Sequence, residues 1–321
     1  GGTFAAPGHH AYLIAGVMKL GLGPVEAARG LSAVFGLIAM LGALVVGREL
    51  WGRVGAVAAL ALVGLSRWPV TVSRVGMFNV VTPACLLLGL GLTLWGVRQD
   101  RLTLKMSGGM ALGFGVGFHS SMWPGLLGVV ALLFFATFSN RSILRSLWVP
   151  LVGVVVVAEP IAGVAVRDFD LYTERQTEVS LFSSGSENIL GDLGANSRAV
   201  LGMFTVEGDR NGRHNIPGEP VLDPVAGGLL VLGLVLAARR IASPVAIGLL
   251  LWGFIALVPG AITIPSEAPN ALRVIASMPV VYLLAAGALV TALRALPKPA
   301  VPIGLCLLVI TLAGWTNSPR M

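Results

Sequence analysis

The chain has 321 residues, of which 55% are hydrophobic and 12% are charged, and its mean hydropathy is +0.86. Soluble globular domains average about 25% charged residues, so this composition excludes an ordinary soluble globule and indicates a membrane protein. The net charge of +7 does not indicate a nucleic-acid partner, because the basic residues lie in short loops between apolar runs.

Residues 1–27 are interpreted as the end of an outer loop followed by an interfacial helix. The apolar piece 11–22 contains Lys19 and is shorter than the roughly 17 residues that a crossing needs, so it is expected to lie on the membrane surface. His9 and His10 are adjacent, but two neighbouring histidines without a third ligand do not specify a metal site.

Ten apolar runs then predict an all-α transmembrane bundle with about ten spans. The first six form a core over residues 28–166, and the last four form a C-terminal region over residues 224–321. The fourth run contains several glycines, of which Gly108 and Gly109 come first. Such glycines are typical of closely packed helices rather than of a phosphate-binding loop. Cys85 and Cys306 both lie in apolar runs, so no disulfide framework is implied. The predicted spans are 28–47, 54–72, 79–97, 106–121, 123–138, 146–166, 224–238, 243–262, 274–292 and 299–315.

Basic residues in alternate loops predict the orientation of these spans. Eleven of the 22 lysines and arginines lie in loops that contain only two acidic residues. Such an excess of positive charge is typical of cytoplasmic loops. The chain ends, residues 167–223 and residues 263–273 are therefore expected outside. The eleven basic residues are Arg48, Arg53, Arg98, Arg101, Lys105, Arg141, Arg145, Arg239, Arg240, Arg294 and Lys298.

Residues 167–223 form a 57-residue polar loop whose charge is opposite to that of the rest of the chain. The loop has ten acidic residues and five arginines, which give a net charge of −5, whereas the remainder carries +12. Because ordered loops of this length are usually functional, we predict that this extracytoplasmic loop carries part of a functional site.

Polar side chains also gather where the other predicted outer loops meet the spans. Arg67 and Arg74 occur in one such turn, His119 in the next, and Arg273 in the last. Arginines at this level are placed to bind a phosphate group with two parallel hydrogen bonds. The alternatives are arginines that extend to the interface, a histidine that only packs, and loop residues that are only solvated.

Glu159 is a separate candidate because it lies within a predicted span and is followed by Pro160. An acidic residue inside a membrane is a functional candidate, since burying a carboxylate there is costly. The alternative is a carboxyl group near the interface, hydrogen-bonded or protonated at a proline kink.

Several stretches resemble bacterial GT-C-type glycosyltransferases of the protein O-mannosyltransferase-like branch. They begin with residues 7–53, from Pro-Gly-His-His to the Gly-Arg-Glu-Leu-Trp-Gly-Arg turn, and continue with the Leu-Ser-Arg-Trp-Pro-Val-Thr-Val-Ser-Arg turn at 65–74. The start of the polar loop near Arg175, its return at 204–223 and the Pro-Asn-Ala-Leu-Arg run at 269–273 follow in the family's order. The resemblance covers nearly the whole chain.

The resemblance implies transfer of a sugar from a polyprenyl-phosphate carrier to an acceptor on the outer face of a bacterial plasma membrane. Arg74 and Arg273 would then hold the carrier phosphate. The candidates for substrate binding are His119, Arg175, Arg213, His214, Asn215 and Asn270. The general base of the family is an acidic residue in the first outer loop, yet no acid precedes Glu26. We therefore expect that loop, and one span, to lie upstream of residue 1, and we assign no catalytic residue.

Two other functional classes stay open at this stage. A secondary transporter or lipid flippase would also use outer arginines and an intramembrane glutamate, although no inverted repeat is visible. A membrane scaffold without catalytic activity is the third class. The partners expected from the first class are the lipid bilayer, the carrier-linked sugar and an unknown acceptor. No cofactor is specified, and a divalent cation is compatible with the resemblance.

Overall fold

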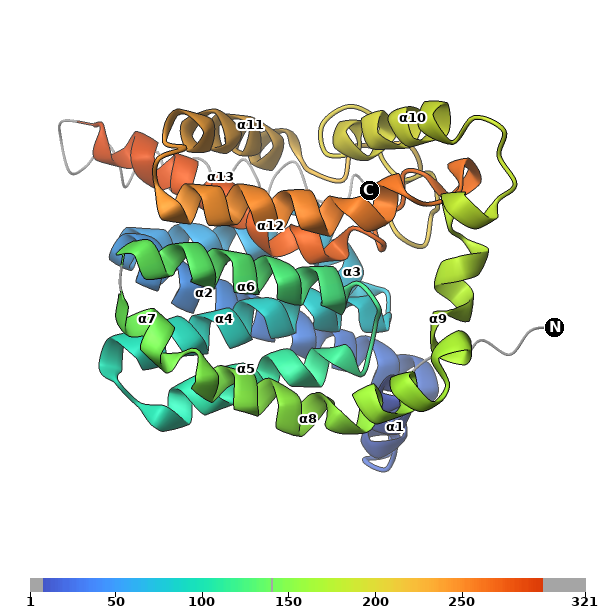
Figure 1. Cartoon of the computed structure of the whole chain (residues 1–321), viewed down its shortest axis with the longest axis horizontal. Coiled ribbons are helices and arrows are strands. Elements are labelled where there is room, and N and C mark those ends of the chain that lie inside the picture. The colour runs from blue at the N-terminus through green and yellow to red at the C-terminus, as the bar shows by residue number, and fades with distance from the viewer. Residues whose placement is uncertain (1–7, 140, 297–321) are drawn as a thin grey trace.

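The computed structural model describes residues 8–139 and 141–296, which form a bundle of long, roughly parallel helices (Figure 1). The described residues contain no named strand, and Ser180 and Thr263 form an isolated antiparallel bridge. The all-α prediction is confirmed. The α-helices are α1 (His9–Met18), α2 (Pro24–Leu65), α3 (Arg67–Arg74), α4 (Val81–Gln99), α5 (Leu102–Val116), α6 (Met122–Ser139), α7 (Arg141–Ser146), α8 (Trp148–Arg167), α9 (Phe169–Glu178), α10 (Ile189–Gly202), α11 (Pro224–Arg239), α12 (Pro244–Ala261) and α13 (Met278–Arg294). Short 3-10 turns are η1 (Phe78–Val80), η2 (Leu181–Ser183), η3 (Pro265–Glu267) and η4 (Ile275–Ser277).

Helix α2 contains two predicted spans that are joined by a reversal at Gly52. Gly52 has a φ of 78°, in the left-handed region that favours glycine. The two arms then pack against each other, because a Cβ on Gly47 would meet the backbone oxygen of Gly55, and Met40 lies against Gly64. Glycines at the start of the hairpin thus permit backbone contact between its two arms.

The second arm of α2 ends earlier than the sequence predicts. The predicted span ran to residue 72, but Ser66 is extended, with φ −76° and ψ 150°, and a separate helix, α3, follows it. Trp68 and Val72 of α3 are buried, whereas Arg74 is exposed. The alternation of apolar and polar residues in Arg67–Arg74 suits a short amphipathic helix rather than the end of a span.

Five helical stretches are long and apolar enough to cross a bilayer. Two of them, which contain α4 and α13, lie at the centre of the bundle. Most residues of the central pair are buried, whereas the α7–α8 stretch lies at the periphery. The five stretches are Pro24–Leu65, Phe78–Gln99, Arg141–Arg167, Pro244–Ala261 and Ile275–Arg294, and the apolar helices Met122–Phe138 and Pro224–Arg239 are shorter. The predicted span 106–121 is the 15-residue helix α5, which ends at Val116. The predicted span 299–315 lies outside the described residues.

The small residues of α5 allow this helix to contact two neighbours closely. A Cβ on Gly109 would meet the carbonyl oxygen of Pro150 in α8, and a Cβ on Gly108 would lie 2.7 Å from the carbonyl oxygen of Gly89 in α4. The glycines of this run therefore serve helix packing, as the sequence predicts.

The predicted cytoplasmic loops meet at one end of the bundle and the predicted outer loops at the other. At the first end, Arg98 pairs with Glu49 at 2.9 Å and Arg294 donates to the carbonyl oxygen of Trp51 at 2.7 Å. At the opposite end, α9 runs from α8 to α10 across the bundle, on the right in Figure 1. Which end faces the cytoplasm stays a prediction.

Candidate functional site

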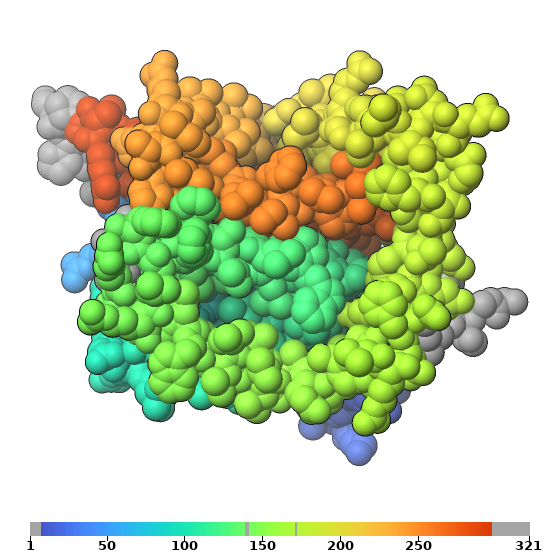
Figure 2. Space-filling view, in the orientation of Figure 1, coloured from blue at the N-terminus to red at the C-terminus, as the bar shows by residue number. Residues whose placement is uncertain are grey.

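A cavity of about 1780 Å³ opens at the end of the bundle that carries the polar loop. Its walls come from η1, the α5–α6 turn, α9, α10, the 207–214 loop and the 262–273 segment between α12 and α13. In the space-filling view the yellow-green α9 and α10 stand across this end of the molecule (Figure 2). Segments far apart in the sequence therefore build one chamber.

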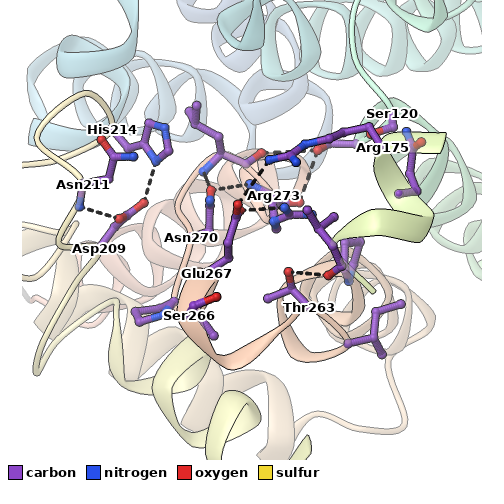
Figure 3. Close-up of a pocket in the computed structure, with 18 of the residues that line it drawn as sticks. Ser120, Arg175, Asp209, Asn211, His214, Thr263, Ser266, Glu267, Asn270 and Arg273 are labelled. Atoms are coloured by element: carbon purple, nitrogen blue, oxygen red, sulfur yellow. Dashed lines mark hydrogen bonds and ion pairs between the residues drawn. The ribbon is translucent and has the colours of Figure 1, made fainter. Parts of the chain in front are cut away.

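Five arginines line this chamber, and two of them hold a single carboxylate. Arg273 Nη2 lies 2.7 Å from one oxygen of Glu267, and Arg175 Nη2 lies 3.2 Å from the other (Figure 3). Burial alone would raise the pKa of Glu267, but hydrogen bonds and charge from Arg273 and Arg175 outweigh it and lower that pKa. The Nε of Arg273 is buried and has no hydrogen-bond partner in the described structure. The five arginines are Arg175, Arg198, Arg210, Arg213 and Arg273.

Asp209 and His214 form a second, more buried pair in the wall of the chamber. Asp209 Oδ2 lies 2.8 Å from His214 Nδ1 and accepts a hydrogen bond from the amide of Ala271 at 2.9 Å. Its Oδ1 accepts from the amide of Asn211 at 2.8 Å (Figure 3). Burial would raise the pKa of Asp209, and the hydrogen bonds from His214 and the two amides lower it overall. This carboxylate joins the 207–219 loop to the segment before α13.

The 207–219 loop closes on itself next to this pair. The amide of Gly218 donates to the carbonyl oxygen of Asp209 at 3.2 Å, and Gly218 has a φ of 78°. The side-chain amide of Asn215 donates to the carbonyl oxygen of Glu219, and the carboxylate of Glu219 pairs with Arg67 at the start of α3. Asn215 is therefore a buried loop-forming residue, and Arg67 anchors the loop to the bundle.

His119 lies on an aromatic wall of the chamber. Its ring centroid is 5.6 Å from that of Phe78, and its Nδ1 accepts a hydrogen bond from the amide of Ser121 at 3.2 Å. Ser121 Oγ in turn donates to the carbonyl oxygen of Arg273 at 3.2 Å. Burial, followed by the positive charge of Arg273, lowers the pKa of His119 to about 4. The ring is therefore neutral at physiological pH.

Six of the eight predicted phosphate- and substrate-binding residues line the chamber: His119, Arg175, Arg213, His214, Asn270 and Arg273. Asn215 packs behind the chamber wall, and Asn270 uses its Oδ1 to accept hydrogen bonds from the amides of Leu272 and Arg273. Arg74 is exposed at the end of α3, outside the residues that line the chamber. The functional roles of these residues stay predictions.

Glu159, the predicted intramembrane acid, does not reach the chamber. It is exposed on the surface of α8, next to Pro160, and is absent from the residues that line the cavity. Within residues 8–139 and 141–296, no group of three or more His, Cys, Asp or Glu side chains is arranged to hold a metal ion.

Sequence reasoning missed Asp209 and Glu267, the two carboxylates that organise the site. Asp209 precedes His214 by five residues across a Gly-Asp-Arg-Asn-Gly turn, which is a signal for a local Asp–His contact. Glu267 precedes Arg273 by six residues, but its contact with Arg175 joins positions 92 residues apart. The first pairing had a local sequence signal, and the second depends on the fold.

Comparison with known proteins relates this fold to membrane enzymes. Residues 6–165 match the family model described as dolichyl-phosphate-mannose-protein mannosyltransferase. The crystal structure of ArnT from Cupriavidus metallidurans in the apo state matches with a TM-score of 0.59 and 17% identity, covering 95% of this chain and 52% of that chain. The structure of ArnT from the same organism bound to undecaprenyl phosphate matches with a TM-score of 0.61 and 18% identity, covering 96% and 53%.

This chain thus spans about half the length of the ArnT structures that it matches. A search of curated proteins gives no match. The family model covers just under half of the chain and ends within α8, and the fold similarity extends over nearly all of the chain. The family-model match and the fold similarity together support a GT-C membrane glycosyltransferase.

Proposed function

We propose that this protein transfers a sugar from a polyprenyl-phosphate carrier to an acceptor at the membrane face where the chamber opens. The observation that carries this proposal is the position of the arginine-lined chamber at one end of an apolar helix bundle. A carrier of this kind needs a bilayer for its tail and cationic side chains for its phosphate. The ArnT structure bound to undecaprenyl phosphate supports the same kind of ligand for this fold.

Arg273 is the residue that we propose to hold the carrier phosphate. Its guanidinium faces the chamber, its side chain is 21% exposed, and its buried Nε is unpaired in the described structure. A guanidinium here would bind the phosphate of the intact carrier and stabilise the additional charge that develops when the sugar leaves. Arg74, the exposed last residue of α3, is proposed as a second phosphate contact outside the chamber.

The other candidate residues fall into two groups, those whose polar groups face the chamber and those whose side chains already bond to the backbone. Arg213 and His119 present polar groups to the chamber and are proposed to contact the sugar or the acceptor. Asn215 and Asn270 use their side chains on backbone groups, so their proposed contribution is to hold the binding loops in shape. The sugar and the acceptor are not defined by these contacts.

Transfer of a labelled sugar tests the proposed function. Membranes that contain the protein are incubated with polyprenyl phosphate carrying a radiolabelled sugar, and label loss from the lipid is measured together with release of free polyprenyl phosphate. Both are expected only with the protein present, and both are expected to slow in the Arg273→Gln variant. Movement of intact carrier across the bilayer without loss of sugar would instead favour a lipid transporter.

A further inference from the structure

One part of the chamber wall carries no Asp, Glu, Lys or Arg side chain. This neutral wall consists of residues 77–79, at η1, and residues 118–121, in the α5–α6 turn, all of which line the cavity. The acidic and basic residues of the lining come instead from α9, α10, the 207–214 loop and the 262–273 segment. The chamber is therefore divided into a neutral part and a charged part.

Phe78 supplies an aromatic surface to the neutral wall. Its side chain is half-buried, and its ring centroid lies 5.7 Å from that of His10 and 5.6 Å from that of His119. Phe118 also lines the cavity, but it is only 2% exposed and packs against Phe114 with ring centroids 4.9 Å apart. Phe78 is therefore the phenylalanine of this wall that a ligand can contact.

His119 adds a hydrogen-bond donor beside this ring. Its Nδ1 accepts the amide of Ser121, so the proton of the neutral imidazole is on Nε2. Within residues 8–139 and 141–296, Nε2 forms no hydrogen bond with another residue. The imidazole is neutral at physiological pH, because burial and the charge of Arg273 lower its pKa to about 4. The neutral wall thus combines an aromatic ring with an N–H group that can donate to a ligand.

Hydrogen bonds join the neutral wall to Arg273, the proposed phosphate-binding residue. Ser121 Oγ donates to the carbonyl oxygens of Leu272 and Arg273 at 3.3 and 3.2 Å, and the amide of Ser121 donates to His119. The charge of Arg273 also acts on the His119 ring. In a sugar-bearing carrier the sugar is bonded directly to the phosphate. A phosphate held by Arg273 therefore brings the sugar to the adjoining wall.

We propose that Phe78 and His119 form the subsite for the sugar of the donor and determine which sugars are accepted. The inference rests on the proposed function. The face of an aromatic ring is electron-rich, so it attracts the weakly positive C–H groups on one side of a sugar ring. His119 Nε2–H donates a hydrogen bond to a sugar hydroxyl. A sugar is accepted when its C–H face meets Phe78 and a hydroxyl meets His119.

Several other neutral side chains of the lining already form hydrogen bonds within the protein. The hydroxyl of Tyr172 accepts from Trp123 Nε1 at 2.9 Å, and Thr263 Oγ1 donates to the carbonyl oxygen of Val179 at 3.1 Å. Asn270 uses its Oδ1 on two backbone amides. These side chains hold the chamber together, whereas the Nε2–H of His119 is left for a ligand.

The experiment compares binding of undecaprenyl phosphate with binding of its glucosyl, mannosyl, galactosyl and xylosyl esters to the intact protein in nanodiscs. We expect the wild-type protein to bind at least one ester more tightly than the bare lipid. Phe78→Leu removes the ring face, and His119→Asn keeps an acceptor for the Ser121 amide but withdraws the ring donor. Each is expected to lower the preference for that ester by about two- to tenfold, the range for one aromatic contact or one hydrogen bond.

The affinity for bare undecaprenyl phosphate is expected to stay unchanged in both variants, which also shows that they are folded. Phe138→Leu is the matched control, because Phe138 is 67% exposed on α6 and lies outside the chamber lining. The control is expected to keep the wild-type preference for the sugar-bearing lipid.

The outcomes separate this inference from the proposed function. Equal wild-type affinity for the bare lipid and all four esters, or a preference that survives both substitutions, would overturn the sugar subsite while the transferase function stands. Weaker binding of bare undecaprenyl phosphate in Phe78→Leu and His119→Asn would overturn it too, by showing that the wall supports the phosphate site. Absence of lipid binding and of sugar transfer in the wild-type protein would overturn the proposed function, and the subsite with it.

Discussion

Glu267 places one carboxylate oxygen 2.7 Å from Nη2 of Arg273, inside the chamber that we propose binds a phosphate. The other oxygen lies 3.2 Å from Arg175, which also contacts Glu178 at 3.3 Å. This carboxylate lies between two guanidinium groups, and we expect the carrier phosphate to compete with it for them. Under the proposed function, the two arginines would exchange this carboxylate for the carrier phosphate.

We expect the Glu267→Gln variant to bind polyprenyl phosphate more tightly than the wild-type protein, by up to about fivefold. The reason is that a neutral amide competes less for Arg273, and a partly exposed ion pair contributes up to about 1 kcal/mol. Glu178→Gln is the control, because Glu178 is exposed and, in the part of the chain that the structure describes, pairs with Arg175 but not with Arg273. Binding measured by titration into nanodiscs tests this, and weaker binding in Glu267→Gln would show that Glu267 holds the arginines in place for the ligand.

Replacement of Arg273 by Gln is expected to weaken carrier binding by about 1.5–3 kcal/mol, the range for a hydrogen bond to a charged group. Lysine at this position should restore only part of that loss, because it lacks the planar fork of arginine. Arg74→Gln is measured in parallel, since Arg74 is exposed and outside the chamber lining. Equal affinity in the wild-type protein and both Gln variants would show that neither arginine contacts the phosphate.

Hydrophobic run lengths and basic loops predicted most of the helix arrangement, because a membrane forces apolar residues into long helices. The ends of helices depend on single residues, and the length of an apolar run does not identify those residues. Ser66 turns the chain out of α2 before the predicted span end at 72, and Gly117 follows the last residue of α5 before the predicted span end at 121. The reversal at Gly52, by contrast, coincides with charged residues and was visible in the sequence.

The sequence predicted most of the residues that line the chamber, but it did not predict which of them contact one another. Outer-end arginines and histidines stand out against an apolar background, and most of them line the chamber. Their partners are set by tertiary contacts such as Asp209 with Ala271 and Ser121 with Arg273, which join residues 62 and 152 positions apart. Glu159 stood out in the same way, yet its side of α8 faces away from the bundle. The rotation of α8 about its axis, which composition does not predict, determines that Glu159 does not line the chamber.

The lowered pKa of His119 predicts a loss of stability on mild acidification. The folded protein holds this ring neutral down to about pH 4, whereas the unfolded chain protonates it near 6.5. The unfolded state therefore binds more protons below pH 6.5, so this contribution to stability is present above that pH and is lost as the pH falls toward 4. The maximum effect is roughly 3 kcal/mol.

Thermal unfolding of the purified protein at pH 7 and pH 5 measures this effect. His119→Asn is the matched variant, because its side-chain oxygen can still accept the Ser121 amide but does not titrate in this range. We expect the wild-type protein to lose more stability between the two pH values than the variant does. The same pH dependence in both proteins would show that the folded ring is protonated along with the unfolded one.

Gly109→Ala is expected to destabilise the bundle by about 1–3 kcal/mol, the usual effect of inserting an extra group into a packed interface. The new methyl group would overlap the carbonyl oxygen of Pro150 in α8, and backbone atoms cannot move aside as a flexible side chain can. Gly163→Ala in α8 is the control, since nothing lies within 4 Å of its Cβ position. Denaturation midpoints compare the two, and a stable Gly109→Ala protein would mean that α5 and α8 pack less closely than described.

Labelling of single introduced cysteines tests the orientation on which the proposed function depends. Ser184 lies in the polar loop after η2, and Ser142 lies in α7 beside Arg141 and Arg145; both serines are exposed. Because basic loops are retained on the cytoplasmic side, a membrane-impermeant thiol reagent added to intact cells should label Ser184→Cys. The reagent should reach Ser142→Cys only after the membrane is opened. The parent protein is the control for its own two cysteines, of which Cys85 is buried. The reverse pattern would place the arginine-lined chamber in the cytoplasm, where an acceptor on the outer face could not enter it.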